Sequence, residues 1–200
     1  ADFVALSVVR SKQDIDYGRS LIEKFGGHAA IIAKIERIDA VKNSAEIIDA
    51  ADGIMIARGD LAIEIGEAEV PGVQKKLVKL ARSMSKPVIV ATQMMESMIH
   101  QRVPTRAEVS DVANAVLDGA DAVMLSAETA VGSFPKEVVD AVVNICFSAE
   151  KYDKDINSPM FKSDFANTDQ AVSFAAMYIA NSMNVAAIIA LTESGKTPLL

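Results

Sequence analysis

Charged residues interrupt two of the most apolar stretches of the chain. Lys34 and Glu36 stand in the run AIIAKIE, and Asp60 directly follows the run GIMIARG. Residues two apart in a β-strand point to the same face, so Lys34 and Glu36 are predicted to project side by side. A lysine in such a run is costly to bury unless it meets an anion. One cation and two carboxylates at a sheet edge suit an anionic substrate together with a divalent metal ion.

The same residues also allow purely structural interpretations. Lys34 and Glu36 could form an ion pair at the rim of a sheet, and Gly59 with Asp60 could form an ordinary turn after a strand. Alternatively, the Gly59 and Asp60 amides at the start of a helix would bind a carboxylate or phosphate. Thr92, after the run PVIVA, adds a hydroxyl at the same edge, for a substrate or for a local hydrogen bond.

A second polar loop follows the apolar run AAIIAL near the end of the sequence. Its segment SGKT, Ser194 to Thr197, is not a P-loop, because that motif needs glycine where Ala190 stands. A Ser/Thr/Gly/Lys loop after a strand can still bind phosphate through its backbone amides. A plain turn fits the pattern equally well.

Apolar runs alternate with helical patterns along most of the chain. Thr105 and Glu108 have capping-box spacing and open a helix that should end at Gly119. Strands that are apolar on both faces and are each followed by a helix predict parallel βα units. The expected strands are DFVALSVV, AIIAKI, GIMIA, PVIVA and DAVML, and the expected helices cover 11–25, 39–51, 70–84, 106–117 and 135–150.

This α/β pattern suits either a (β/α)8 barrel or a doubly wound sheet. Polar residues after every strand favour the barrel, whose active sites are built from many strand ends. Five strands cannot close such a barrel, so we expect the chain to lack N-terminal strands and to be a piece of a longer protein.

The amino-acid composition changes after the predicted barrel strands. Residues 153–167 are polar and rich in turn formers, which predicts a linker between a first domain, 1–152, and a second, 168–200. In the second domain, residues 168–183 should form a helix and AAIIAL a strand.

Composition excludes several classes of protein. The net charge of −7 and the pI near 4.9 argue against binding nucleic acid or an anionic membrane surface. No apolar run approaches the roughly 18 residues that a membrane span needs. Cys146 is the one cysteine, so no internal disulfide can form. The first residues do not resemble a signal peptide, and we expect a cytoplasmic protein.

Several long motifs resemble the pyruvate kinase family. They are KIER, IMIARGDLAIEI, PVIVATQMMESM, PTRAEVSDVANAVLDGADAVMLSAETA and GSFP, and they occur in order between Asp2 and Glu150. The resemblance implies the last five strands of a (β/α)8 TIM barrel, followed by the beginning of an α/β regulatory domain. It also implies an Mg²⁺-dependent phosphotransferase of glycolysis, converting phosphoenolpyruvate and ADP to pyruvate and ATP.

Roles for individual residues follow from the same resemblance. Lys34 would stabilise the transferring phosphoryl group and the enolate, and Glu36 with Asp60 would bind Mg²⁺ or Mn²⁺. The backbone of Gly59 and Asp60, together with Thr92, would contact the substrate carboxylate. Thr92 would also lie near the face where the enolate is protonated. The family's K⁺ ligands and its phosphate-binding arginine are not in this chain, so we expect the isolated chain to be inactive.

The resemblance further implies regulation and assembly. Arg106 corresponds to a position at the subunit contact of the family's homotetramers. A phosphorylated sugar or nucleotide effector would bind a loop formed by Thr192, Ser194, Gly195, Lys196 and Thr197. Two other hypotheses stay open at this stage. One is an Mg²⁺-dependent barrel aldolase or lyase that acts on a keto acid, and the other is a barrel-derived effector-binding module without turnover.

Overall fold

The computed structural model describes residues 1–156, 168–183 and 185–191, with side chains of 153–156 left aside. The chain divides into two compact units, Ala1–Asp153 and Lys154–Leu200. Residues 157–167 of the predicted linker lie outside the described residues. The predicted domain boundaries therefore stay predictions.

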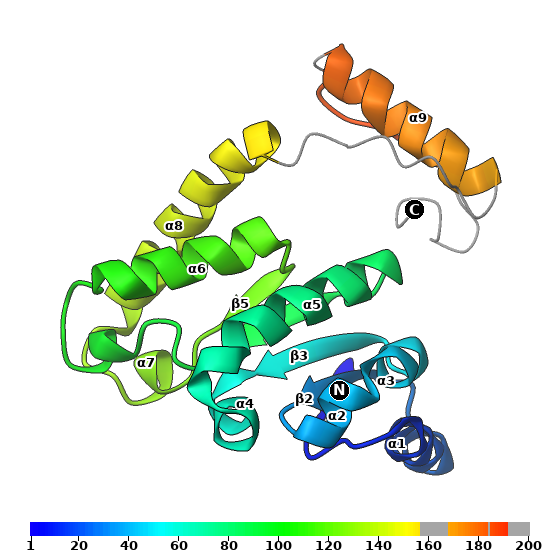
Figure 1. Ribbon diagram of the computed structural model, residues 1–200, viewed down its shortest axis with the longest axis horizontal. Helices are drawn as coiled ribbons and strands as arrows, with labels where there is room; N and C mark the ends of the chain where they lie inside the picture. The colour runs from blue at the N-terminus through cyan, green and yellow to red at the C-terminus, as the bar shows by residue number, and fades with distance from the viewer. Residues whose placement is uncertain (157–167, 184, 192–200) are drawn as a thin grey trace. The chain divides into compact units, whose positions relative to one another are not determined.

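Five strands of the first unit form one sheet, and every neighbouring pair is parallel (Figure 1). Their spatial order is the sequence order, β1-β2-β3-β4-β5. A doubly wound sheet reverses its order at a switch point, whereas a barrel wall does not. The predicted α/β fold is confirmed, and the strand order favours the barrel over the doubly wound alternative. The strands are β1 (Phe3–Leu6), β2 (Ala30–Ile35), β3 (Gly53–Ala57), β4 (Val88–Ala91) and β5 (Ala122–Met124).

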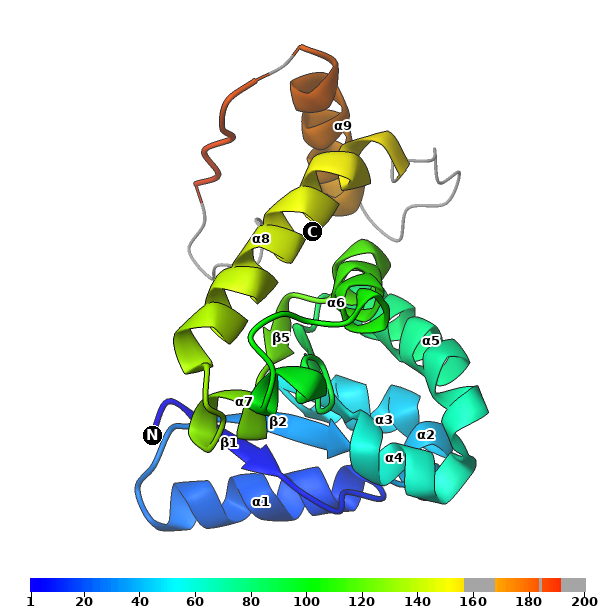
Figure 2. The ribbon, with the colours of Figure 1, turned by 90° about the vertical axis from the view of Figure 1, so that its left-hand side faces the viewer.

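Helices connect the strands and cover one face of the sheet (Figure 2). Helices α1 and α3 pack against β2, α5 packs against β3 and β4, and α6 packs against β5. The helices of the first unit are α1 (Lys12–Lys24), α2 (Ile38–Lys42), α3 (Ser44–Ala50), α4 (Arg58–Ile65), α5 (Val70–Ser83), α6 (Arg106–Asp118), α7 (Ala127–Ala130) and α8 (Pro135–Ile156), with short 3-10 helices η1 (Glu67–Glu69) and η2 (Glu96–Ile99).

The two faces of the sheet have different neighbours. Ile31, Ala33 and Ile35 of β2 belong to the large core beneath the helices. Ile32 points to the opposite face, where it forms a small cluster with Met55 and Ala91. Since side chains alternate along a strand, the next residues on that second face are Lys34 and Glu36. The pleat of β2 therefore directs both charged groups away from the helices.

The caps of α6 confirm the predicted boundaries. Thr105 Oγ1 accepts a hydrogen bond from Glu108 N at 3.2 Å, and Glu108 Oε2 accepts one from Thr105 N at 2.7 Å. At the other end, Gly119 caps the helix with a φ of 95°, in the left-handed region. Each cap satisfies backbone groups that the helix leaves unpaired.

Two local predictions need correction. The helix expected over 39–51 is two helices, α2 and α3, because Asn43 leaves helical geometry and its Nδ2 donates to Arg10 O at 2.9 Å. Residues 58–65, for which a turn or a helix start was expected, form helix α4. Helix α8 continues to Ile156, past the expected end at Glu150, since no Gly or Pro interrupts those residues.

The second unit contains α9 (Thr168–Ser182), as predicted. The strand expected over 186–191 is wrong, since no strand is assigned there. A strand needs a paired neighbour, and none of the described strands pairs with this segment. Within the described ranges, no helix has the length and hydrophobicity to cross a membrane.

Replacement of Gly119 should destabilise the protein. Gly119 has positive φ, and an added Cβ would meet the Arg82 guanidinium at 2.1 Å. We expect Gly119→Ala to lower the free energy of unfolding by about 1–2 kcal/mol. Gly72 is the matched control, because in α5 an added Cβ meets no atom within 4 Å. Gly72→Ala should be neutral or stabilise by up to about 1 kcal/mol. Urea unfolding followed by circular dichroism measures both, and equal effects would contradict the prediction.

Candidate active site

Strand β2 brings Lys34 and Glu36 together at its carboxyl end. Lys34 Nζ lies 2.9 Å from Glu36 Oε2 and also donates a hydrogen bond to Ser7 Oγ at 2.8 Å. Glu36 is only 6% exposed. The predicted side-by-side placement of this cation and this carboxylate is what the structure shows.

The two oxygens of the Glu36 carboxylate have different neighbours, the Val8 amide and the Lys34 ammonium. Val8 N donates to Glu36 Oε1 at 2.5 Å, and the φ of Val8 is 59°. Such a conformation is uncommon for a β-branched residue. Oε2 is buried and accepts no hydrogen bond from the described residues, although the Lys34 ammonium lies close enough for an ion pair. A buried oxygen of this kind can still accept a further cation.

Asp60 reaches the same place from the next strand along the sheet. Helix α4 begins directly after β3, and Asp60 is the third residue of that helix. Its side chain lines one cavity of about 410 Å³ with Lys34 and Glu36, while Asp60 itself is exposed. The other residues of the cavity wall are Ser7, Val8, Arg37, Ile63 and Glu64.

Thr92 follows β4 and contacts Gly59 at the start of α4. Thr92 Oγ1 accepts a hydrogen bond from Gly59 N at 2.8 Å and donates one to Ala91 O at 2.6 Å. Two of the predicted substrate contacts, Gly59 and Thr92, therefore touch each other at the ends of neighbouring strands. The sequence analysis expected the Gly59 amide to contact a substrate carboxylate. In this structure the amide donates its hydrogen bond to the Thr92 hydroxyl instead.

Arg58 lies beside the site, and the sequence analysis did not assign its side chain a role. It is 9% exposed, and its guanidinium forms a close ion pair with Asp111, with both nitrogen–oxygen distances 2.7 Å. The same guanidinium donates to the carbonyl oxygens of Thr92 and Gln93. A signal was present, because an arginine at the end of the buried run GIMIA needs an acidic partner. The sequence did not show which acid that is.

Two carboxylates, the buried Glu128 and the half-buried Glu108, hold the segment after Thr92. Glu128 Oε1 accepts from Met95 N at 3.2 Å, and Glu108 accepts from Ser97 N at 2.7 Å and from Ser97 Oγ at 2.6 Å. Burial raises the pKa of Glu108, but hydrogen bonds from Ser97 and Thr105 outweigh this and leave the pKa below its ordinary value. The methionines of this segment are core residues with no exposed surface: Met94, Met95 and Met98.

Other predicted functional residues lie away from this arrangement or outside the described residues. Arg106 is exposed at the first position of α6, and its role at a subunit contact stays a prediction. The predicted effector loop lies outside the described residues, and its members are Thr192, Ser194, Gly195, Lys196 and Thr197.

The donor set of the cavity fits a hard divalent ion with few protein ligands. Across the described ranges of the chain, no group of three or more His, Cys, Asp or Glu side chains is arranged to hold a metal. Mg²⁺ commonly takes only one or two carboxylates and completes its shell with water and substrate oxygens. Glu36, with one buried oxygen free of hydrogen bonds, and Asp60, exposed in the same cavity, suit that arrangement.

Comparison with known proteins assigns the family. The model of the pyruvate kinase barrel domain matches residues 1–139. The chain belongs to the pyruvate kinase family. Pyruvate kinase of Haemophilus influenzae is 51% identical over 100% of this chain and 43% of that protein. Pyruvate kinase II of Salmonella typhimurium is also 51% identical, over 100% of this chain and 42% of that protein.

A solved structure gives the same result for the fold. A pyruvate kinase from Cryptosporidium parvum superimposes with a TM-score of 0.88 at 40% identity, over 99% of this chain and 43% of that chain. The chain therefore spans about two fifths of the pyruvate kinases that it matches.

The lowered pKa of Glu108 predicts a pH-dependent contribution to stability. A carboxyl group whose pKa is lower in the folded state stabilises the fold above its ordinary value of 4.5. That contribution is lost as the pH falls through the folded-state pKa. Glu108→Gln should therefore cost about 1–3 kcal/mol near neutral pH, and the difference from the unsubstituted protein should shrink as the pH falls below 4.5.

Urea unfolding at a series of pH values measures this difference. Glu23→Gln is the matched control, because Glu23 is exposed on α1 and the change should cost less than about 0.5 kcal/mol. A difference for Glu108→Gln that stays constant with pH would show that the carboxylate charge is not what stabilises the segment.

Proposed function

We propose that this chain carries part of the active site of an enzyme that transfers a phosphoryl group from phosphoenolpyruvate to ADP, giving pyruvate and ATP. The observation that carries the proposal is the convergence of Lys34, Glu36 and Asp60 on one cavity at the carboxyl edge of a parallel sheet. That edge is where (β/α)8 enzymes place their active sites. Membership of the pyruvate kinase family supports the same reaction.

The reaction breaks the bond between phosphorus and the enol oxygen and forms a new bond to a terminal phosphate oxygen of ADP. Negative charge develops on the phosphoryl oxygens and on the enolate that is left behind. The Lys34 ammonium is placed to stabilise both charges, because its ion pair and its hydrogen bond to Ser7 hold it at the cavity wall. Positioning and charge stabilisation are the main contributions that phosphoryl transfer requires from a protein.

Glu36 and Asp60 would hold Mg²⁺ or Mn²⁺ in this site. The ion, when bound, would neutralise phosphoryl charge and orient the substrate oxygens. The substrate carboxylate would lie against the backbone of Gly59 and Asp60 and the hydroxyl of Thr92. The bond between Gly59 N and Thr92 Oγ1 implies that the substrate exchanges partners there on binding. Protonation of the enolate at its methylene carbon, near Thr92, then gives pyruvate.

Assembly, regulation and location are also proposals. We infer a homotetramer with Arg106 at a subunit contact, a phosphorylated sugar or nucleotide effector at the loop 192–197, and a cytoplasmic location. The exposed position of Arg106 is compatible with a contact between subunits.

Substitution of the charged groups tests the reaction in the intact parent protein. Lys34→Met should lower kcat by about 10²–10³-fold or more, since it removes the cation at the developing charge. Lys79→Met is the matched control, because Lys79 is exposed on α5, and it should leave the rate unchanged. A coupled assay of pyruvate and ATP formation measures both. Full activity of Lys34→Met, or cleavage of a carbon–carbon bond instead of phosphoryl transfer, would overturn the proposal.

Metal binding can be tested without turnover. Asp60→Ala and Glu36→Gln should each weaken Mn²⁺ binding to the parent protein by about 10–100-fold, as loss of a metal ligand or its close support does elsewhere. Electron paramagnetic resonance of free Mn²⁺ gives the affinity directly. Glu23→Gln, remote on α1, serves as the carboxylate control. Unchanged Mn²⁺ affinity in both site variants would place the metal elsewhere.

A further inference from the structure

Thr92 and Gln93 have an unusual backbone. Their φ angles are 71° and 53°, so two consecutive residues other than glycine adopt the left-handed conformation. Such residues are uncommon, and they persist where surrounding contacts over-determine the backbone. The contacts that hold these two residues are therefore part of what places the Thr92 hydroxyl.

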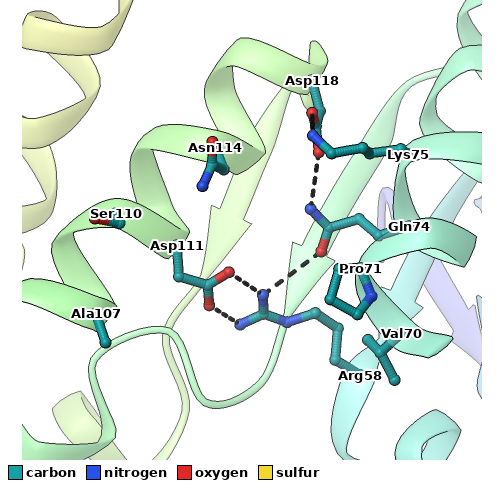
Figure 3. Close-up of a pocket in the computed structure, with 10 residues that line it drawn as sticks. All are labelled: Arg58, Val70, Pro71, Gln74, Lys75, Ala107, Ser110, Asp111, Asn114 and Asp118. Atoms are coloured by element: carbon teal, nitrogen blue, oxygen red, sulfur yellow. Dashed lines mark hydrogen bonds and ion pairs between the residues drawn. The ribbon is translucent and has the colours of Figure 1, made fainter. Parts of the chain in front are cut away.

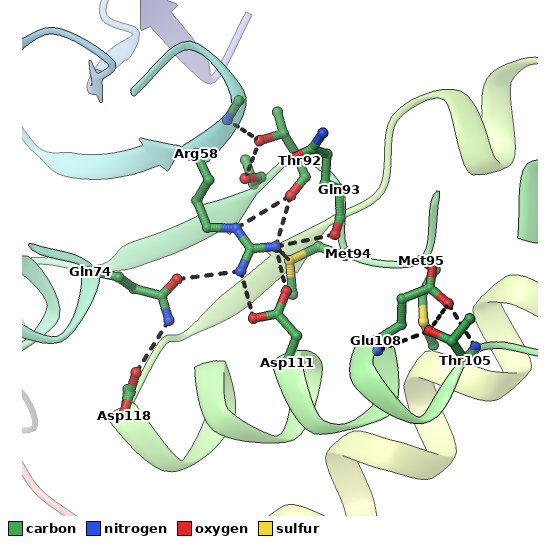
Figure 4. A network of polar contacts seen from close by, with 12 residues as sticks. Arg58, Gln74, Thr92, Gln93, Met94, Met95, Thr105, Glu108, Asp111 and Asp118 are labelled. Carbon is green, nitrogen blue, oxygen red and sulfur yellow. Dashed lines mark hydrogen bonds and ion pairs between the residues drawn. The ribbon is translucent and has the colours of Figure 1, made fainter. Parts of the chain in front are cut away.

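Arg58 supplies those contacts. Its Nη2 donates to Thr92 O at 2.9 Å and to Gln93 O at 3.3 Å, and its Nε donates to Thr92 O at 3.3 Å. Figure 4 shows the guanidinium facing both carbonyl groups. Because Arg58 is 9% exposed, these bonds form with little competition from water.

A second set of contacts fixes the guanidinium itself. Asp111 of α6 meets Nη1 and Nη2 with its two oxygens, each at 2.7 Å. Gln74 of α5 lies at the same nitrogen, Nη1, at 3.5 Å, and it donates in turn to Asp118 at 3.2 Å. Figure 3 shows these side chains beside a cavity of about 270 Å³ lined by α5 and α6. Side chains from α5 and α6 thus hold the arginine, and neither helix contributes a residue to the cavity that Lys34 lines.

Gly59, the residue after Arg58, holds the side chain of Thr92. Gly59 N donates to Thr92 Oγ1, while the Arg58 side chain holds the Thr92 carbonyl. The first two residues of α4 therefore fix both the backbone and the hydroxyl of Thr92. Asp60, the next residue of the same helix, lines the cavity with Lys34 and Glu36.

We propose that Arg58, held by Asp111, is a positioning residue that keeps the Thr92 hydroxyl aimed at the substrate carboxylate. This inference rests on the proposed function, in which Thr92 contacts that carboxylate. Arg58 itself touches no substrate and acts through the backbone of Thr92. A lysine could not replace it, because a single ammonium cannot serve two carbonyl groups and a two-oxygen ion pair in one plane.

The test compares steady-state kinetics of variants of the intact parent protein. Arg58→Lys should raise the KM for phosphoenolpyruvate about tenfold, the effect of weakening one hydrogen bond to a bound charge. The KM for ADP should stay unchanged, because Thr92 faces the three-carbon acid. Arg82→Lys is the matched control, since Arg82 is exposed on α5, and it should change neither constant. If Arg58 only stabilised the fold, Arg58→Lys would lower the amount of active enzyme but would not change the KM for phosphoenolpyruvate relative to the KM for ADP.

A double-mutant cycle decides whether Arg58 acts through the Thr92 hydroxyl. In a Thr92→Ala background, Arg58→Lys should raise the KM for phosphoenolpyruvate by less than about twofold, because the group it positions is gone. Asp111→Asn is a second variant that leaves Arg58 in place, and it should show the same selective effect on phosphoenolpyruvate. Its result stands even if Arg58→Lys does not fold.

The outcomes separate this inference from the proposed function. Absence of pyruvate formation by the unsubstituted parent protein would overturn both. Normal activity with equal KM changes for both substrates, or independent effects of Arg58→Lys and Thr92→Ala, would overturn the positioning role alone.

Discussion

The arrangement at the carboxyl edge of the sheet depends on the burial of one carboxylate. Glu36 is 6% exposed, and removing a carboxylate from water costs several kcal/mol unless cations and donors replace the water. Lys34 and the Val8 amide provide that replacement, at 2.9 Å and 2.5 Å. Val8, whose N–H makes this bond, has a positive φ, a conformation that persists only where surrounding contacts hold it. One buried charge thus fixes the segment after β1 against the end of β2.

The same physical rule governs the segment after β4. There the buried charge is the Arg58 guanidinium, and the groups that replace water are Asp111 and the carbonyl oxygens of Thr92 and Gln93. Farther along the segment, Glu128 and Glu108 accept from backbone amides of residues 95 and 97. Polar residues that touch a substrate need this kind of rigid support, because small displacements reduce their effect.

Fold and site are linked through the pleat of the strands. Alternate residues of β2 pack beneath the helices, which leaves the opposite face for Ile32, Lys34 and Glu36. Because neighbouring strands are parallel, the ends of β1 to β4 bring Ser7, Lys34 with Glu36, Asp60 and Thr92 to the same edge. Enzymes with (β/α)8 barrels catalyse many different reactions at this edge, so the fold alone does not define the reaction. The charged groups and the family membership together support the proposed phosphoryl transfer.

The sequence by itself determined the features that depend on near neighbours. Continuous apolar runs specify the five strands of the first unit, the spacing of Thr105 and Glu108 specifies a helix start, and the two-residue spacing of Lys34 and Glu36 places them on one face. Only the tertiary structure decided the strand order, the break between α2 and α3, and the partner of Arg58. The ion pair with Asp111 joins residues 53 positions apart in the chain. A local pattern can show that a buried charge needs a partner, but packing in three dimensions selects which residue provides it.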